Sequence, residues 1–236
     1  MRAVNKRDLS ILQDTSRYRT GVPEAYRLRH FAGLTLKAVE RVTTRLQGEE
    51  LLKSFPLFGR NRYFTLTPKA ARILGVSEKW LERPMGPQSL IQNISILAAC
   101  CLGPTPRERM TVEEFTERFP KLVVRGLGSS RYCLDRDASS GLVRLSLLLP
   151  DFQSDRRRLV RKVRREFDRR MRHPAWNRLT SDGLFSTTLL TAFPKKAEAL
   201  AEALARESWP HRVEVVPYLA KLLVQEGSHE RRPRGG

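Results

Sequence analysis

The sequence contains too few cysteines to build a disulfide framework or a metal site. Cys100, Cys101 and Cys133 are its three cysteines among 236 residues, and its four histidines are scattered along the chain. Zinc sites need Cys and His residues at short, defined spacings, and none is present, so we expect no metal and no other cofactor. The three thiols are expected to be buried and reduced, as in cytoplasmic proteins.

Long apolar runs are also missing from the chain. No stretch of ~18 apolar residues is available to cross a membrane, and no basic amphipathic terminus stands out. The N-terminal MRAVNKRDLSIL lacks the apolar core and the small-residue cleavage site of a signal peptide. We therefore expect a cytoplasmic protein that does not interact with a membrane.

Acidic residues are scarce relative to basic ones. The chain has 25 Asp and Glu against 44 Lys and Arg, a net charge of +19 and a pI near 10.8. The surplus is spread evenly, with 17 basic and 8 acidic residues in 1–84 and 27 and 17 in 85–236. Hydrophobic residues make up an ordinary 40%, so the chain is globular. Such uncompensated charge on a folded chain indicates a polyanionic partner.

Three helical patterns, a hairpin and a fourth short helix follow one another in the first 75 residues. Apolar residues recur at helical spacing, and Gly or Pro marks the breaks. Helices are expected at residues 8–18, 22–31, 36–47 and 69–74, and strands at 51–58 and 62–66. Thr35 is the candidate N-cap of the third helix, and Gly75 ends the fourth. This order predicts a winged helix-turn-helix domain over residues 1–84.

The third helix and the hairpin are expected to contact DNA. A recognition helix enters the major groove, so its outer face needs cationic and small polar side chains. The candidate contacts are Thr35, Lys37, Arg41, Thr44 and Arg45 of the third helix, Arg60, Asn61 and Arg62 of the hairpin, and Arg27 and Arg29 of the second helix. Arg41 and Arg45 are the residues expected to read bases. The alternative is a solvated charged face, the commonest role of such residues.

Residues 85–226 alternate between helical and strand-like patterns. Helix breakers in ERPMGP, residues 82–87, predict the boundary with the first domain. Helices are expected at 90–102, from Thr111 with Glu114 in capping-box spacing, at 155–172 and at 195–207. Strands are expected at 122–124, 131–134, 142–149, 185–192 and 213–216. This alternation predicts a small mixed α/β domain and an α+β fold overall, with a disordered tail at 227–236.

The helix expected at residues 155–172 is unusually basic. It holds ten Lys and Arg against three acids, too few to pair most of the cations. Val160, Val163, Phe167 and Met171 form an apolar stripe that can dock on a sheet. The outward residues that we expect to contact DNA phosphates are Arg157, Arg158, Arg161, Lys162 and Arg165, with Arg164 and Arg169 also outward. The alternative is a solvent-exposed helix with pairs such as Lys162 with Glu166.

Four aspartates near predicted strand ends are the only candidates for catalysis. Metal-assisted phosphodiester hydrolysis needs converging acidic ligands, usually with a lysine. Asp151 and Asp155 follow the most apolar strand, but no carboxylate lies within that strand's last residues and no Lys follows. Asp135 and Asp137 are interpreted as turn residues before Ser139-Ser-Gly141. We therefore predict no enzymatic activity.

Several segments resemble the replication-relaxation family of winged-helix proteins, which bacterial plasmids and other mobile elements encode. The resemblance runs through RDLSILQDTSRYR, VPEAYRLRHF, TLKAVERVTTRL and RYFTLTPKAARILG, and continues in SLIQNISILAA, with Asn93, and TVEEFTERFP. It implies that the second domain is a degenerate nuclease-type fold. In LSLLLPDF, Leu148, Leu149 and Pro150 stand where related proteins often carry an acidic residue, which leaves only Asp151.

The resulting hypothesis is a non-enzymatic double-stranded DNA-binding protein. The resemblance implies control of replication, mobilisation or transcription of a bacterial plasmid or mobile element, in the cytoplasm and associated with the nucleoid or plasmid. A homodimer on two half-sites and contacts with replication or relaxase proteins stay open. The alternatives are a metal-dependent DNA nuclease or nicking enzyme, and an adaptor that binds RNA or protein.

Overall fold

The computed structural model describes residues 5–78, 81, 85–103, 107–136, 141–151, 154–216 and 219–220. These residues form an α+β structure of two compact units, the first reaching Leu102 and the second spanning Gly103–Ala220. The helix breakers at 82–87 predict a division after residue 84, but the contacts place it after Leu102. The reason is that helix α5 (Pro87–Cys101) packs against the first two helices of the first unit. The predicted tail at 227–236 lies outside the described residues.

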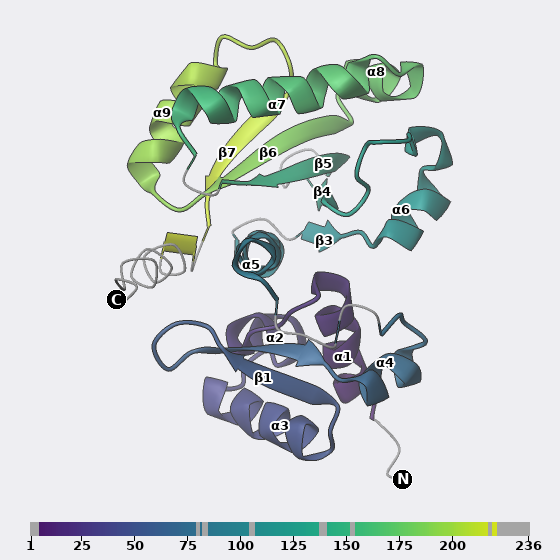
Figure 1. Cartoon of the computed structure of the whole chain (residues 1–236), viewed down its shortest axis with the longest axis vertical. Coiled ribbons are helices and arrows are strands. Elements are labelled where there is room, and N and C mark those ends of the chain that lie inside the picture. The colour runs from purple at the N-terminus through teal and green to yellow at the C-terminus, as the bar shows by residue number, and fades with distance from the viewer. Residues whose placement is uncertain are drawn as a thin grey trace, which may run out of the picture. The chain divides into compact units, whose positions relative to one another are not determined.

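The first unit has three helices, a hairpin and a fourth helix in chain order, followed by α5 (Figure 1). Its elements are α1 (Lys6–Tyr18), α2 (Pro23–His30), α3 (Leu36–Gly48), β1 (Leu52–Pro56), β2 (Arg62–Leu66) and α4 (Pro68–Leu74). Strands β1 and β2 pair antiparallel. The predicted order of elements is confirmed, with boundaries that differ by a few residues.

Local capping residues set several of these boundaries. The Thr35 hydroxyl accepts a hydrogen bond from the Ala38 amide at the start of α3, and Thr67 does the same for Ala70 in α4. Such caps satisfy amides that have no partner within the helix. Gly75 ends α4 with φ +67°, a left-handed conformation that favours glycine.

The core of the first unit lies between the helices and the hairpin. Ile11 and Leu12 of α1, Val39 and Leu46 of α3 and Phe64 of β2 are all buried in it. Each such side chain contributes roughly 1.5–3 kcal/mol relative to an exposed one. The apolar stripe of α3 is therefore turned inward, which leaves its polar face outside.

Gly21 joins the turn between α1 and α2 to the hairpin. Its amide donates to the Phe64 carbonyl at 3.0 Å, and the Phe64 amide donates back to the Gly21 carbonyl at 2.9 Å. A Cβ at position 21 would lie only 1.8 Å from the Tyr26 hydroxyl, which itself lies 2.6 Å from Thr15 Oγ1. Only glycine fits this close approach.

The second unit is built on one five-stranded mixed sheet. Its elements are β3 (Arg107–Arg109), α6 (Val112–Arg118), the 3₁₀ turn η1 (Pro120–Leu122), β4 (Tyr132–Arg136), β5 (Val143–Pro150), α7 (Arg156–Met171), α8 (Pro174–Ser181), β6 (Phe185–Thr191), α9 (Pro194–Leu204) and β7 (His211–Val215). The strand order is β3-β4-β5-β6-β7, antiparallel up to β5 and parallel from β5 to β7. The predicted mixed sheet is confirmed. The strand predicted at 122–124 is wrong, because Pro120 starts a 3₁₀ turn there.

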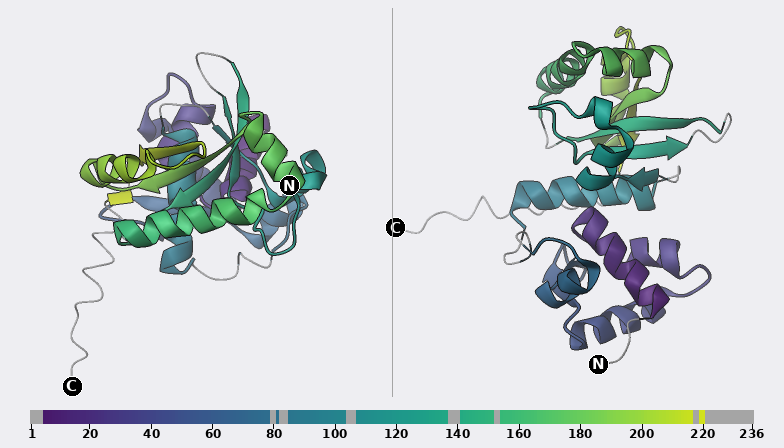
Figure 2. Two further views of the ribbon diagram at one scale, coloured as in Figure 1. Left: turned by 90° about the horizontal axis from the view of Figure 1, so that it is seen from above. Right: turned by 90° about the vertical axis from the view of Figure 1, so that its right-hand side faces the viewer.

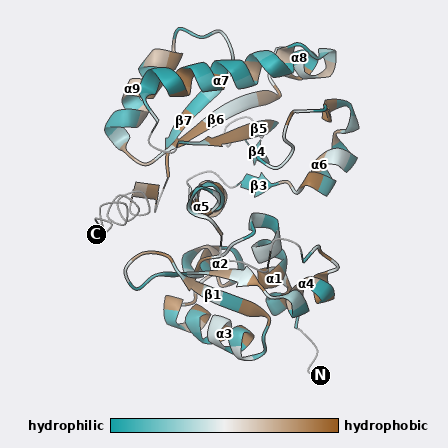
Figure 3. Cartoon of the chain, viewed as in Figure 1, coloured by the Kyte–Doolittle hydropathy of each residue, from teal (hydrophilic) through white to brown (hydrophobic). Residues whose placement is uncertain are grey.

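The helices α7, α8 and α9 gather on one face of this sheet (Figures 1 and 2). Alternate residues of the central strands, including Leu147 and Leu149 of β5 and Leu189 of β6, join Leu159 and Val163 of α7 in a single core. Figure 3 shows β5 as largely hydrophobic and most of α7 as hydrophilic. The apolar face of α7 thus packs against the sheet, as the spacing of its apolar residues predicts.

One arginine of α7 belongs to the core. Arg170 has a side chain that is 0% exposed, and its Nε donates to the Tyr132 hydroxyl at 2.9 Å. Its Nη1 donates to Glu166 Oε2 at 2.9 Å, and its guanidinium lies 5.6 Å from the centroids of the Tyr132 and Trp176 rings. The sequence pattern gave no indication of this buried cation.

Candidate nucleic-acid interface

The outer face of α3 presents three predicted contact residues together. Lys37, Arg41 and Thr44 are exposed, and their spacing of four and three residues puts them on one side of the helix. Within the described part of the chain, no ion pair or hydrogen bond engages these three side chains. Glu40 is also exposed on this helix, although it is not among the predicted contacts, which are cationic or small polar residues. A carboxylate here can accept from the amino group of cytosine.

Arg45, predicted to read bases, has internal partners that the sequence does not indicate. Its Nη2 donates to both carboxylate oxygens of Asp8 in α1, at 2.7 and 2.8 Å, and its Nη1 donates to Glu49 at 3.1 Å. The Asp8 side chain is 3% exposed, and its hydrogen bonds raise the pKa of Arg45 above the ordinary value. Arg45 therefore ties α3 to α1, and its guanidinium is already engaged by two carboxylates. Thr35 is likewise engaged, as the N-cap of α3.

The hairpin tip exposes the three predicted wing residues. Arg60, Asn61 and Arg62 are exposed, and Arg62 Nη1 donates to Ser54 Oγ at 3.2 Å. Backbone bonds close the turn, from the Leu57 amide to the Asn61 carbonyl and from the Asn61 amide to the Phe58 carbonyl, both at 2.9 Å. Leu57 and Phe58 at the start of the turn are buried, so the exposed tip extends from a packed base.

The two candidate arginines of α2 are placed differently. Arg27 is half-buried, whereas Arg29 pairs with Asp14 of α1 through Nε at 2.5 Å and Nη2 at 3.2 Å. His30 Nε2 lies 2.7 Å from the same carboxylate. Burial by itself raises the pKa of Asp14, but hydrogen bonds with His30 and Arg29 outweigh it and hold that pKa below its ordinary value. Arg29 thus fastens α2 to α1.

This carboxylate predicts a pH-dependent stability of the first unit. Because the pKa of Asp14 is lowered on folding, its stabilisation is present above the ordinary value near 3.8 and is lost as the pH falls through the lowered value. We expect Asp14→Asn to cost about 1–3 kcal/mol at pH 7. Urea unfolding at pH 7 and pH 3 should show the gap between wild type and variant narrowing at the lower pH. An equal gap at both would contradict this role.

The predicted contacts of α7 are mostly available to a ligand. Arg157, Arg158, Arg161 and Arg165 are exposed, but Lys162 is half-buried. Burial and the neighbouring Arg131 lower the pKa of Lys162. Arg156 is not among the predicted contacts, but it is exposed at the first position of the helix. The unbroken run Arg156-Arg157-Arg158 after the capping Asp155 is the sequence feature that could have indicated it.

Two further arginines of α7, predicted to point outward, are held by the fold. Arg164 pairs with Glu207, and Arg169 Nη2 donates to the Gly126 carbonyl at 2.5 Å. Both side chains keep an outward position, with 56% and 42% of their surface exposed, but partners from distant segments engage them, which the sequence does not indicate.

The candidate catalytic aspartates are engaged in separate interactions. Asp135 lies within β4, not in a turn as predicted, where Arg212 Nη1 donates to it at 2.8 Å and Arg107 lies at 3.5 Å. Asp151 lies 2.5 Å from Lys196 Nζ, and Asp155 caps α7. Asp137 lies outside the described residues. In the described part of the chain, no three His, Cys, Asp or Glu residues are grouped so as to hold a metal ion.

The three cysteines carry free thiols. Cys100 and Cys133 are buried as predicted, whereas Cys101 is half-buried. Burial raises the pKa of Cys101 to about 12, so this thiol is a poor nucleophile.

Comparisons with known proteins give no further guide to the site. No family model, no curated protein and no solved structure matches the chain. None of the helices in the described segments is long and apolar enough to cross a membrane. The interface must therefore be judged from its own geometry.

Proposed function

We propose that the first unit is a winged helix-turn-helix domain that binds duplex DNA, with α3 as its recognition helix. The observation that carries the proposal is the two-sided character of α3. Val39 and Leu46 are buried on its inner side, while Lys37, Arg41 and Thr44 are exposed on its outer side and have no ion pair or hydrogen bond with any described residue. A major groove about 12 Å wide admits one helix presenting such side chains.

The roles of the contact residues follow from what each side chain is free to do. Arg41 and Lys37 are the base-reading candidates, since long cationic side chains reach guanine edges, and Thr44 adds a short polar contact. Arg60 and Asn61 at the hairpin tip contact the minor groove or the backbone, with Arg27 as a further backbone contact. Arg45 and Arg29 act as positioning residues, because they hold α3 and α2 against α1.

The proposed biological role rests on the sequence resemblance alone. Under it, the protein is a non-enzymatic regulator of replication, mobilisation or transcription on a bacterial plasmid or mobile element. Its location would be the cytoplasm, on the plasmid or nucleoid. The degenerate nuclease-type interpretation of the second unit belongs to the same proposal.

Selection of bound sequences from random duplexes tests the DNA-binding proposal. We expect enrichment of a short motif of the size that one recognition helix covers in the major groove, or of two copies of that motif. The same motif should be protected in footprinting. Single-stranded DNA and RNA serve as competitors in the same assay. Binding without any enriched motif, or equal competition by single strands, would contradict a recognition helix.

A further inference from the structure

The arginines of α7 form two sets that differ in what holds their side chains. Three of them are held by the fold: Arg164 by Glu207, Arg169 by the Gly126 carbonyl and Arg170 by Glu166. A second set is exposed and has no ion pair or side-chain hydrogen bond among the described residues. This set, the open arginines, comprises Arg156, Arg157, Arg158, Arg161 and Arg165.

The open arginines extend from a helix that is firmly seated. The Asp155 carboxylate accepts from the amides of Arg157 at 2.8 Å and Arg158 at 3.2 Å, which fixes the start of α7. Beneath the helix, Leu159 and Val163 are at most 1% exposed. Because the backbone is already ordered, a ligand need only order the side chains.

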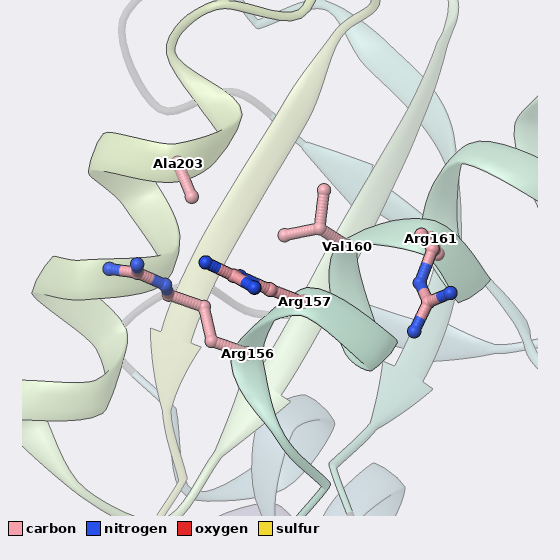
Figure 4. Close-up of a pocket in the computed structure, with 5 residues that line it drawn as sticks. All are labelled: Arg156, Arg157, Val160, Arg161 and Ala203. Carbon is pink, nitrogen blue, oxygen red and sulfur yellow. The ribbon is translucent and has the colours of Figure 1, made fainter.

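A shallow, open pocket of about 550 Å³ lies at the start of α7. It is lined by Arg156, Arg157, Val160 and Arg161 of α7 and by Ala203 of α9. Figure 4 shows the Arg156 and Arg157 guanidinium groups extending toward α9, while Arg161 turns to the other side of Val160. Guanidinium groups bind phosphates through paired N–H donors, so this pocket suits phosphate oxygens.

The distribution of charge beyond the pocket favours an extended ligand. Arg156 and Arg165, the first and last of the open arginines, are nine positions apart, or ~13 Å of helix at about 1.5 Å per residue. One strand of duplex DNA presents a phosphate about every 3.4 Å along its axis, so roughly four fall within that length. A single nucleotide would fill the pocket and leave Arg165 without a partner.

The packing of α7 also argues against a lipid surface as the ligand. An interfacial helix places its apolar face in the bilayer. The apolar face of α7 is not available to a bilayer, because its Leu159 and Val163 are buried in the core against the sheet.

We infer that the open arginines of α7, with the pocket beside α9, form a second DNA contact surface that holds the sugar–phosphate backbone without reading bases. The identification of the polyanion as duplex DNA rests on the proposed function. The phosphate-binding character of the surface does not depend on it. It assigns to the second unit a role in salt-dependent affinity, and to α3 the role in sequence preference.

Salt titration of the full chain with Arg156→Gln, Arg157→Gln and Arg161→Gln together tests this inference. Each lost phosphate contact lowers the slope of log affinity against log salt by about 0.9, so the triple variant should lose up to ~2.7. The ratio of affinities at 50 and 200 mM salt should then shrink by ~40-fold. Preferred and random duplexes should be affected alike, and footprints should not move.

The matched control removes the same charge from exposed arginines elsewhere in the second unit, through Arg118→Gln, Arg125→Gln and Arg172→Gln. The inference would be overturned if the variant with Arg156→Gln, Arg157→Gln and Arg161→Gln, the pocket variant, kept the wild-type salt slope. It would also be overturned if the control variant lost as much slope as the pocket variant. A slope loss confined to duplex RNA, or a change only in sedimentation with phosphatidylserine vesicles, would overturn it as well. A slope loss in the pocket variant without any sequence preference in the wild type would sink the proposed function but keep this surface.

Discussion

Arg170→Met is expected to lower the free energy of unfolding of the second unit by about 3 kcal/mol. The substitution removes the buried cation that donates to Glu166, whose side chain is only 13% exposed, leaving Arg169 at 3.8 Å, and it deprives the Tyr132 hydroxyl of its donor. The aliphatic part of the side chain is retained, so the loss reports the ionic and hydrogen-bonded contacts. Thermal and urea unfolding followed by tryptophan fluorescence measure it, since Trp176 lies against this guanidinium.

The pH dependence of that loss identifies its origin. Burial raises the pKa of Glu166, but the hydrogen bond from Arg170 and the charges of Arg170, Arg131 and Arg169 together outweigh it and lower the pKa below the ordinary value. The stabilisation therefore exists above the ordinary pKa of a glutamate and disappears as the pH falls through the lowered one. The gap between wild type and Arg170→Met should shrink at pH 3, and adding Glu166→Leu should restore part of the stability.

Arg165→Met is the control for this experiment. It makes the same change on the same helix, at an exposed position, and should alter stability by no more than about 0.5 kcal/mol. Equal losses for Arg165→Met and Arg170→Met would show that helix propensity, not the buried pair, determines the effect.

Arg41→Ala is expected to relax sequence preference by about 1–3 kcal/mol while leaving stability unchanged. The side chain is exposed and has no internal partner in the described structure, so its removal costs the folded protein nothing specific. The measurement compares affinities for the selected duplex and for duplexes changed at single base pairs. Discrimination should fall at one position and persist at the others.

Arg45→Ala should show the reverse behaviour. It leaves the 3% exposed Asp8 carboxylate without its cation, so the expected cost is stability of the first unit, about 1–3 kcal/mol. Base discrimination should survive in the fraction that stays folded. If Arg45→Ala relaxed discrimination at one base pair and left the unfolding midpoint unchanged, the assignment of the two arginines would have to be exchanged.

The features that could be predicted from the sequence are those set by neighbours along the chain. Thr35 caps the helix it was expected to cap, Gly75 ends the helix it was expected to end, and the Thr111–Glu114 capping box is present. The mixed sheet follows from alternating apolar segments such as Val143–Pro150. Each depends on residues within one or two helical turns or on a short continuous apolar run, which the sequence displays directly.

The features that could not be predicted depend on residues far apart in sequence. Asp8 and Arg45 are 37 residues apart, and Arg107 and Glu214, an ion pair between β3 and β7, are 107 residues apart. No local pattern distinguishes a paired arginine from a free one. For the same reason α5 was assigned to the wrong unit, because its composition indicates burial but not which helices bury it.

The backbone bridge between Gly21 and Phe64 has a mechanical consequence. Strand β2 is shared by the hairpin and the helical core, so a force on the tip passes through two backbone hydrogen bonds into the turn before α2. From α1 the Asp8–Arg45 pair carries it to α3. Hairpin and α3 are thus both tied to the helices around the Gly21 turn. Under the proposed function, a duplex that engaged both would meet two surfaces at a spacing set by the fold, and base steps that deform easily to fit it would be preferred even at positions that no side chain touches.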